Sequence, residues 1–461
     1  MIPGYVASLS LIVILILSLS LKPGKYIPQT VTPIPKAELI VDELSKFLMQ
    51  LFLAVALTAS MHSLSYMKGD KDLGVYFTLL LLLATGVTGA ILSNDLFTFY
   101  CFWELTSVSA YSLVGFRWWH WEPAEASLKY LFICTTGALV TLYSISFIYG
   151  LAGTTNFDEV KLSLAKLEGS FVIQVISALF YIGLGTSAAL VPFHSWLPDA
   201  HPAAPSPVSA LLSGVVINVP LYLMMRLYLR VLPTNLSFSY ALIAMGLLSS
   251  IIGNIAALRQ LDVKRFLAYS TIANVGYMLV GLGAAHRALS VGSSDQAVEA
   301  VTGILIHMVN HSIAKSLLFL CIGNVIHEMG SRLFESLEGY GRRMRLTGVL
   351  SAIGLLNLTG IPPLAGYWGK MFITAGLAFK LQDPSIMLAL VLLEANFALA
   401  AGAYAYFIFR GYKGSKPKIK EASLYMVLPE VVLALACVIF SIDPALIVET
   451  AHSCAEALLG Q

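Results

Sequence analysis

The sequence predicts an all-α polytopic membrane protein with about thirteen transmembrane helices. Of its 461 residues, 57% are hydrophobic and 12% are charged, whereas a soluble domain carries about 25% charged residues. The apolar residues form unbroken runs that are long enough to cross a bilayer as helices. No polar stretch between them is long enough for an extramembrane domain. A formal net charge of +2, without a basic stripe of interleaved aromatics, argues against nucleic acid as a partner.

Residues such as Pro, Gly, Asn and Asp separate the apolar runs and set the expected helix ends. The first run has no basic residue before it and no small-residue cleavage site after it. We therefore interpret it as a helix and keep a signal peptide as the weaker alternative. The thirteen expected spans are 4–21, 43–66, 73–92, 94–115, 124–150, 171–197, 205–230, 237–258, 262–284, 297–327, 344–381, 385–410 and 423–442.

Positive charge gives these helices an orientation in the cell membrane. Loops and helix ends on the side of the N-terminus hold more of the 28 Lys and Arg residues than those on the opposite side. The N-terminus is therefore expected in the cytoplasm. An odd number of helices then places the C-terminus outside.

A few charged residues fall inside the expected spans. They are Lys129, Lys315 and Lys370 among the bases, and Glu104 and Glu394 among the acids. A charge at the centre of a bilayer costs about 3 kcal/mol or more, so such residues usually face protein or water and often mark an ion pathway. The alternatives are a structural ion pair or a long side chain that reaches the interface. For Lys129, near a helix start, the second alternative is as good as a functional role.

One of these lysines belongs to a titratable cluster. His307, His311 and Lys315 are spaced i, i+4 and i+8, which places them on one face of a helix. A histidine binds and releases a proton near neutral pH, so the three groups predict a proton relay along about 12 Å of helix. Zinc binding is the rival interpretation, but no third ligand is offered at helical spacing. We expect no bound metal and no cofactor.

Two expected spans are interrupted by prolines near their middles, at 191–207 and at 358–370. Proline removes a backbone donor and clashes with the preceding turn. Non-helical backbone at membrane depth is tolerated where it is buried or lines a cavity. Either break alone could be an ordinary kink, but two breaks five spans apart favour a repeated transporter architecture.

Several motifs, in this order, resemble the antiporter-like subunits shared by respiratory complex I, membrane-bound hydrogenases, related archaeal complexes and multisubunit Na+/H+ antiporters. The resemblance runs from about residue 40 to 410. The motifs are Phe102-Trp-Glu-Leu105, Pro192-Phe-His-Ser-Trp-Leu-Pro-Asp-Ala-His201, Lys264-Arg-Phe-Leu-Ala-Tyr-Ser270, His307-Met-Val-Asn-His311 with Lys315, and Gly360-Ile-Pro-Pro-Leu-Ala-Gly366.

The resemblance implies two inverted five-helix repeats, each with one broken helix and one half-channel. The repeats would occupy 73–230 and 237–410, after N-terminal helices in 1–72 and before a C-terminal helix and tail in 411–461. Family members usually have fourteen helices, so thirteen implies that one N-terminal helix is missing. The ion pathway that the resemblance implies runs through Glu104, His307, His311, Lys315 and the exit residue Lys370, with Lys129 and Glu394 as accessory candidates.

Two positions depart from the family pattern. A lysine is normally found on the first broken helix where this chain has Ser187, and a Lys or His on the next helix where it has Asn218. Neither replacement titrates, so Glu104 would lack its usual cation. The first half-channel is therefore expected to be impaired, while the second keeps its ionisable residues.

These observations favour a proton- or sodium-translocating subunit of a redox-driven or Na+/H+ antiporter complex, with other integral membrane subunits and lipids as partners. Such a subunit is not itself an enzyme. The departures at Ser187 and Asn218 support an alternative, a structural spacer that does not translocate ions. A stand-alone organic-substrate transporter or membrane-embedded enzyme is the least favoured, because no phosphate loop, Ser/His/Asp set, haem motif or metal motif is present.

Overall fold

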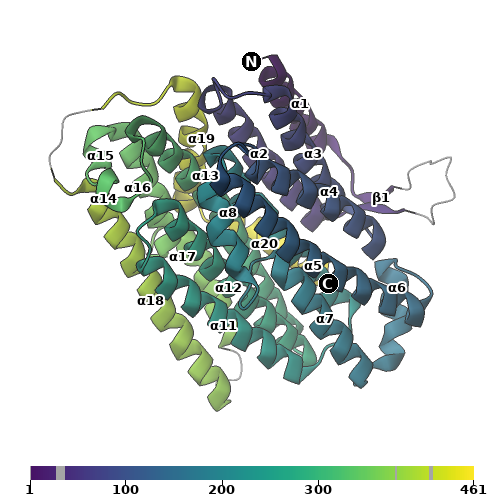
Figure 1. The fold of residues 1–461 in the computed structure, drawn as a ribbon. Helices are drawn as coiled ribbons and strands as arrows, with labels where there is room; N and C mark the ends of the chain where they lie inside the picture. The colour runs from purple at the N-terminus through teal and green to yellow at the C-terminus, as the bar shows by residue number, and fades with distance from the viewer. Residues whose placement is uncertain (1, 27–36, 379–381, 415–418, 461) are drawn as a thin grey trace.

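The computed structural model describes residues 2–26, 37–378, 382–414 and 419–460, and helices dominate it (Figure 1). Four lysines that contribute to the charge balance used for orientation lie outside the described residues: Lys36, Lys380, Lys416 and Lys418. The N-terminal part comprises α1 (Ile2–Ser20), the antiparallel strands β1 (Gly24–Tyr26) and β2 (Leu39–Val41), and α2 (Glu43–Tyr66).

The remaining elements follow in chain order, and η3 and η4 are short π-helical stretches. Those of the first half are α3 (Leu73–Leu92), α4 (Leu96–Val114), α5 (Trp121–Ala152), α6 (Phe157–Leu164), η1 (Ala165–Leu167), α7 (Phe171–Ser187), η2 (His194–Trp196), α8 (Leu197–Ala203), α9 (Ser206–Leu211), η3 (Leu212–Val216), α10 (Asn218–Arg226) and η4 (Leu227–Val231). Those of the second half and the C-terminal part are α11 (Leu236–Leu258), α12 (Val263–Ser290), α13 (Ser294–Met329), α14 (Phe334–Leu337), α15 (Tyr340–Arg343), α16 (Arg345–Thr359), α17 (Ala365–Leu377), α18 (Pro384–Tyr412), α19 (Leu424–Ile442) and α20 (Ala445–Leu459).

Short polar side chains set the starts of several long helices. Asp42, Asp95, Asn235 and Asp262 each accept a hydrogen bond from a backbone N–H in the first turn of the helix that follows. Such N-caps satisfy donors that have no partner inside the helix. The observed helix ends therefore fall close to those expected from the polar residues between the apolar runs.

The connections contain more regular structure than the sequence suggested. Residues 22–42 were expected to be a loop, yet β1 pairs with β2 there. Asn156 accepts hydrogen bonds from the backbone N–H groups of Asp158 and Glu159 and so caps the additional helix α6. Beyond α19, the tail forms α20, which packs against α13 and α2. β1, β2 and α6 are too short for hydrophobic periodicity to predict them, whereas α20 lies in the tail, where no span was expected.

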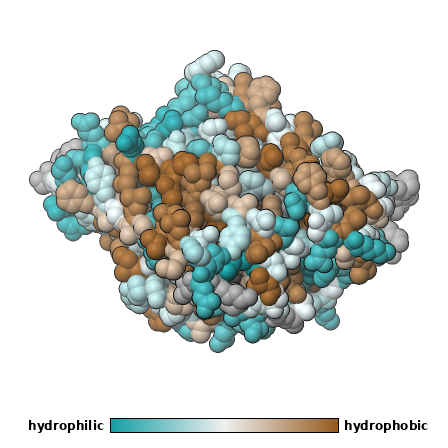
Figure 2. All heavy atoms as spheres, turned by 90° about the horizontal axis from the view of Figure 1, so that it is seen from below, coloured by the Kyte–Doolittle hydropathy of each residue, from teal (hydrophilic) through white to brown (hydrophobic). Residues whose placement is uncertain are grey.

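Among the described residues, ten helices or continuous helical runs are long and apolar enough to cross a membrane. Large apolar side chains cover much of the outer surface, including Met387, Leu388 and Val391 on α18. Figure 2 shows broad apolar patches between hydrophilic areas on the face seen from below. An exposed apolar surface of this kind suits lipid or neighbouring membrane subunits. The structure therefore confirms the all-α polytopic class, while the total of thirteen spans stays an expectation.

Helix α13 lies at the centre of the bundle. It packs against α2, α12, α16, α17, α19 and α20, and its membrane-spanning stretch is entirely buried. By contrast, α1, α5 and α18 lie at the periphery, where most of their residues face outward. The central position of α13 matters because it carries His307, His311 and Lys315.

Both proline-containing segments interrupt a helix. In the first, α7 ends at Ser187, and helical structure resumes with η2 and α8. In the second, α16 ends at Thr359 and α17 begins at Ala365. A break frees backbone carbonyls at the end of the preceding helix, and these need donors because no water is available at membrane depth.

Candidate functional site

The second break is stabilised by Lys370. From α17, its ammonium group donates to the carbonyl oxygens of Leu358 (3.1 Å) and Thr359 (2.8 Å), the last residues of α16. A cation at this position also interacts favourably with the C-terminal end of the helix dipole. Gly360 has a φ of +72°, and a Cβ there would lie 2.5 Å from Cδ of Lys370. The glycine therefore permits both the turn and the close approach of the lysine.

Aromatic rings surround the other side of Lys370. Its Nζ lies 4.8 Å from the ring centroid of Phe397 and 5.6 Å from that of Tyr277. The hydroxyl of Tyr277 bonds to the amide nitrogen of Asn254 (2.7 Å). Lys370 is only 4% exposed, so ring faces and helix carbonyls replace water as the surroundings of its charge.

A cavity of about 390 Å³ opens beside Lys370, and Thr374 and Glu394 also line it. Glu394 was expected inside its span, but its side chain is exposed at the outer surface of α18, where Thr374 donates to it (2.8 Å). The period of a helix cannot tell which face looks outward when apolar residues occur all round it, as they do in α18. The acid therefore lines the mouth of a cavity next to Lys370.

His307 lies one step further into the bundle. Its Nε2 is 3.1 Å from Oδ1 of Asn274, and its ring centroid is 6.0 Å from that of Tyr277. A Cβ on Gly369 would lie within 2.9 Å of the His307 backbone, so α17 and α13 touch at this point. Tyr277 consequently lies beside both His307 and Lys370.

His311 and Lys315 continue this line on α13. Both ring nitrogens of His311 are buried without a hydrogen-bond partner among the described residues. Lys315 is fully buried and donates to the carbonyl of Leu267 (3.0 Å) and to the hydroxyl of Ser270. Buried polar groups without partners are rare in proteins and call for an explanation, such as a bound water or a proton in transit.

A further histidine joins the set from the first half of the chain. His201 on α8 is fully buried, stacks on Phe319 (4.5 Å between centroids), and leaves both ring nitrogens without a partner among the described residues. It lies within electrostatic range of His311 and Lys315. Its motif was recognised in the sequence, but nothing in the spacing linked it to a helix 110 residues away.

In the first half, the candidate residue Glu104 stands apart from this set. Glu104 on α4 has a buried carboxylate oxygen without a partner and forms no ion pair among the described residues. Ser187, 4% exposed, is the last residue of α7, and the indole N–H of Trp196 donates to the neighbouring carbonyl of Thr186 (2.9 Å). A neutral donor thus stabilises this break.

Asn218 and Lys129 have local partners. The side-chain amide of Asn218 donates to Gly214 and to the Ser312 hydroxyl, both at 3.0 Å. Lys129 is exposed and pairs with Glu125 (2.8 Å) and Asp199 (3.2 Å). Its location agrees with a surface ion pair and not with the buried set of Lys315, His311, His307 and Lys370.

Several cations near the expected helix ends are buried, and Arg226 and Lys264 are two of them. Arg226 is 2% exposed and pairs with Asp42 (2.5 Å), while Lys264, 3% exposed, donates to the carbonyl of Ala204 (2.8 Å). Sequence position alone did not separate buried helix ends from solvated ones. Both residues therefore carry less weight as indicators of orientation.

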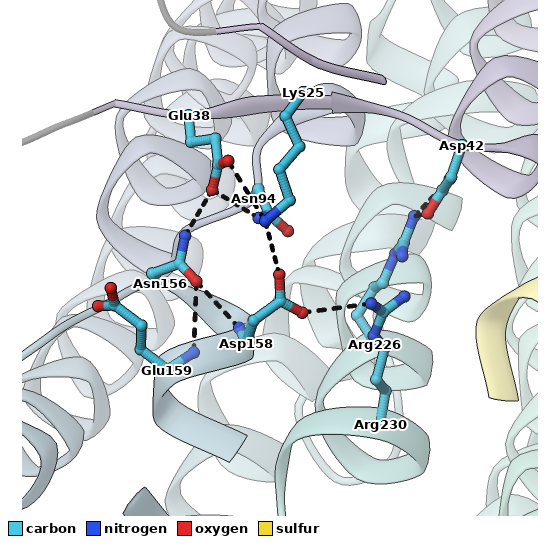
Figure 3. Close-up of polar contacts among 9 residues, drawn as sticks. All are labelled: Lys25, Glu38, Asp42, Asn94, Asn156, Asp158, Glu159, Arg226 and Arg230. Carbon is cyan, nitrogen blue, oxygen red and sulfur yellow. Dashed lines mark hydrogen bonds and ion pairs between the residues drawn. The ribbon is translucent and has the colours of Figure 1, made fainter. Parts of the chain in front are cut away.

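A polar network ties the connecting segments of the first half together (Figure 3). Lys25 pairs with Glu38 (3.4 Å) and Asp158 (3.0 Å), and Arg230 pairs with Asp158 (3.2 Å). Burial raises the pKa of Asp158, but Lys25 and Arg230 outweigh burial and hold that pKa below its ordinary value. Burial likewise opposes the amide donors of Asn94 and Asn156, which together with Lys25 hold the pKa of Glu38 below its ordinary value.

Fold and site together define a multi-pass helical membrane protein whose ionisable side chains are buried between helices. Residues 93–397 match the family described as NADH:quinone oxidoreductase/Mrp antiporter, TM (Proton_antipo_M). The chain therefore belongs to this family of antiporter-like membrane subunits. The match confirms the resemblance that the motifs indicated.

Three similar proteins illustrate the membership. NADH-quinone oxidoreductase subunit N of Desulforudis audaxviator is 32% identical over 344 residues, which cover 74% of this chain and 66% of that protein. Hydrogenase-4 component B of Escherichia coli is 28% identical over 425 residues, covering 87% and 62%. A chain of the membrane-bound sulfane sulfur reductase, an archaeal respiratory membrane complex, superimposes with a TM-score of 0.86 at 27% identity and covers 99% of this chain and 91% of that one.

This chain spans about two thirds of the length of these two curated relatives. Their names describe subunits or components of larger assemblies. The chain itself is a multi-pass membrane protein of the antiporter-like family.

Proposed function

We propose that the chain translocates protons, or sodium ions, through its second half, and that its first half-channel is impaired as a charged relay. The observation that carries the proposal is the buried line of Lys315, His311, His307 and Lys370. The two histidines leave three ring nitrogens without partners among the described residues. The lysine at the exit is held by two helix carbonyls, those of Leu358 and Thr359.

The arrangement supports transfer in a defined order. A protonated Lys315 gives a proton to a free ring nitrogen of His311, which passes one on to His307 at the next turn. His307 then protonates a neutral Lys370 through water beside Tyr277. Lys370 releases the proton into the cavity that Thr374 and Glu394 line. Each step moves one proton, and each histidine returns to its neutral form when it passes its proton on.

The wider setting of the protein follows from its relatives. Their names point to a redox-driven complex of the quinone reductase, hydrogenase or sulfane sulfur reductase type, or to an Mrp antiporter. We propose the cell membrane as the location, with the N-terminus in the cytoplasm and the C-terminus outside. Lipid and other integral membrane subunits would cover the apolar exterior.

Substitution of the two lysines tests the proposal. Lys315→Ala and Lys370→Ala should each strongly lower ion transfer by the complex reconstituted in vesicles, while the complex still assembles. Lys129→Ala is the matched control, because it removes an exposed lysine whose ion pairs lie outside the buried line. Unchanged ion transfer in both test variants would overturn the proposal.

The alternative function is that of a structural spacer. Ser187 and Asn218 favour it, because they leave Glu104 without an ion-pair partner among the described residues. A spacer would tolerate neutral substitutions at Lys315 and Lys370 as readily as at Glu104. The same transfer assay therefore separates the two functions.

A further inference from the structure

A second cluster of buried titratable groups lies on a different side of α13. His62 on α2 and Glu430 on α19 are both fully buried, with 3.6 Å between Nε2 and Oε1. Asn324 of α13 bridges them: its carbonyl oxygen lies 2.9 Å from Nε2 of His62, and its amide donates to Oε1 of Glu430 (2.5 Å). Cys321 donates to the other carboxylate oxygen (3.4 Å). Asn324 is nine residues beyond Lys315, which places it on the opposite face of the helix.

The hydrogen bonds assign the protons of this cluster. Because the Asn324 amide nitrogen donates to Glu430, its carbonyl oxygen must accept from His62, so Nε2 of His62 carries a hydrogen. The other ring nitrogen, Nδ1, is buried without a hydrogen-bond partner among the described residues. In a neutral imidazole this atom has a lone pair and accepts a proton.

The charge of the pair favours proton binding. An ionised Glu430 beside a neutral His62 leaves a net negative charge in a dry environment, which is costly. One added proton makes the pair neutral, whether it settles on Nδ1 or on the carboxylate. Glu421, which precedes α19, adds a further negative charge near Glu430.

A chain of side chains links the pair to one end of the bundle. The ring of Tyr66 lies 5.5 Å from that of His62 and 5.8 Å from that of His327, which is exposed at the end of α13. The Tyr66 hydroxyl also bonds to Ser206 (3.2 Å). At this end α2 and α13 finish and α19 begins, and the three helices lie side by side (Figure 1).

We propose that His62, Asn324, Cys321 and Glu430 form a second proton-binding site, separate from the His307–Lys370 line. The site takes a proton from the side of the membrane where α2 ends, and the rings of His327 and Tyr66 line that approach. The proton adds to Nδ1 of His62 or to Glu430. The described residues hold no group of three or more His, Cys, Asp or Glu side chains placed to bind a metal ion.

Infrared pH-difference spectroscopy of the intact complex in vesicles tests the site, because a protonated carboxyl group has a C=O band in a window free of other protein bands. A titrating band should vanish in Glu430→Gln and shift its midpoint in His62→Gln. Glu449→Gln is the matched control, because it removes an exposed acid on α20 and should leave this band in place. A spectrum with no Glu430-dependent change between acid and alkaline pH would overturn the proposal.

The direction of access gives an independent measurement on the unmodified complex. In vesicles of one orientation, a pH jump on the side where α2 ends should change the band promptly, and His327→Gln should slow that response. A response only to the opposite side would contradict the route. These readouts do not depend on ion transfer through Lys315, so the site and the proposed function can fail separately.

Discussion

Both broken helices end in backbone carbonyls that need hydrogen-bond donors, and a different side chain donates at each break. At the end of α7, the indole N–H of Trp196 satisfies the carbonyl of Thr186, whereas at the end of α16 the ammonium of Lys370 satisfies two carbonyls. Both side chains relieve the cost of unpaired backbone at membrane depth. Only the lysine can also bind and release a proton. The comparison teaches that a helix break creates a polar pocket, while the capping residue decides whether that pocket can carry charge.

The largest effect should follow from changing the proton chemistry of the second break without removing its charge. Lys370→Arg keeps donors for the Leu358 and Thr359 carbonyls, but a guanidinium does not deprotonate in proteins. Proton transfer by the reconstituted complex should fall on the order of a hundredfold, as when a group that shuttles protons is lost. Near-normal transfer in an assembled Lys370→Arg complex would mean that the lysine only caps α16.

A substitution at the first break should instead lower the stability of the protein. Trp196→Phe keeps an aromatic ring for the stack on Tyr130, whose centroid is 4.0 Å away, and removes the indole donor. The Thr186 carbonyl keeps the backbone N–H of Ala189 (3.1 Å) as a donor, so the lost indole hydrogen bond should cost about 0.5–1.5 kcal/mol of the free energy of unfolding. Thermal denaturation of the purified complex measures this loss, and ion transfer before unfolding should stay unchanged. If Trp196→Phe lowered ion transfer as much as Lys370→Arg, the two breaks would not differ in their role in ion transfer.

Lowering the pH should destabilise the first half of the protein by weakening the polar network in Figure 3. Glu38 and Asp158 have pKa values below their ordinary 4.5 and 3.8, so their contribution to stability is present above those values. It is lost as the pH falls through the lowered folded-state values, because the unfolded chain then binds more protons. The unfolding temperature should therefore decline in this acidic window. Glu38→Gln should flatten the decline, and an unchanged slope would remove the network from the explanation.

The smallest effect is expected at Glu104. Because it forms no ion pair among the described residues, Glu104→Gln should leave ion transfer nearly unchanged while Lys315→Ala abolishes most of it. Parallel transfer assays on the two variants make the comparison. A strong loss in Glu104→Gln would show that the first half conducts despite Ser187 and Asn218.

Much of the site was predictable because its residues share one helix. His307, His311 and Lys315 are linked by helical periodicity alone, and their burial on α13 agrees with that spacing. Tyr277 and His201 lie on other helices, and no sequence spacing places them beside this set. Glu394 shows the opposite failure: its position within an apolar run was clear, but its outward direction was not.

The sequence by itself determined the environment and the local breaks of this protein. Long apolar runs require lipid around them, the proline-containing segments 191–207 and 358–370 interrupt helices, and ordered motifs identify the family. Which side chains meet was decided by the tertiary structure. His62 and Glu430 are 368 positions apart in the chain, and they touch because α2 and α19 pack against each other and against α13. Helical periodicity fixes the face on which a residue lies, whereas the packing of the bundle decides what that face meets.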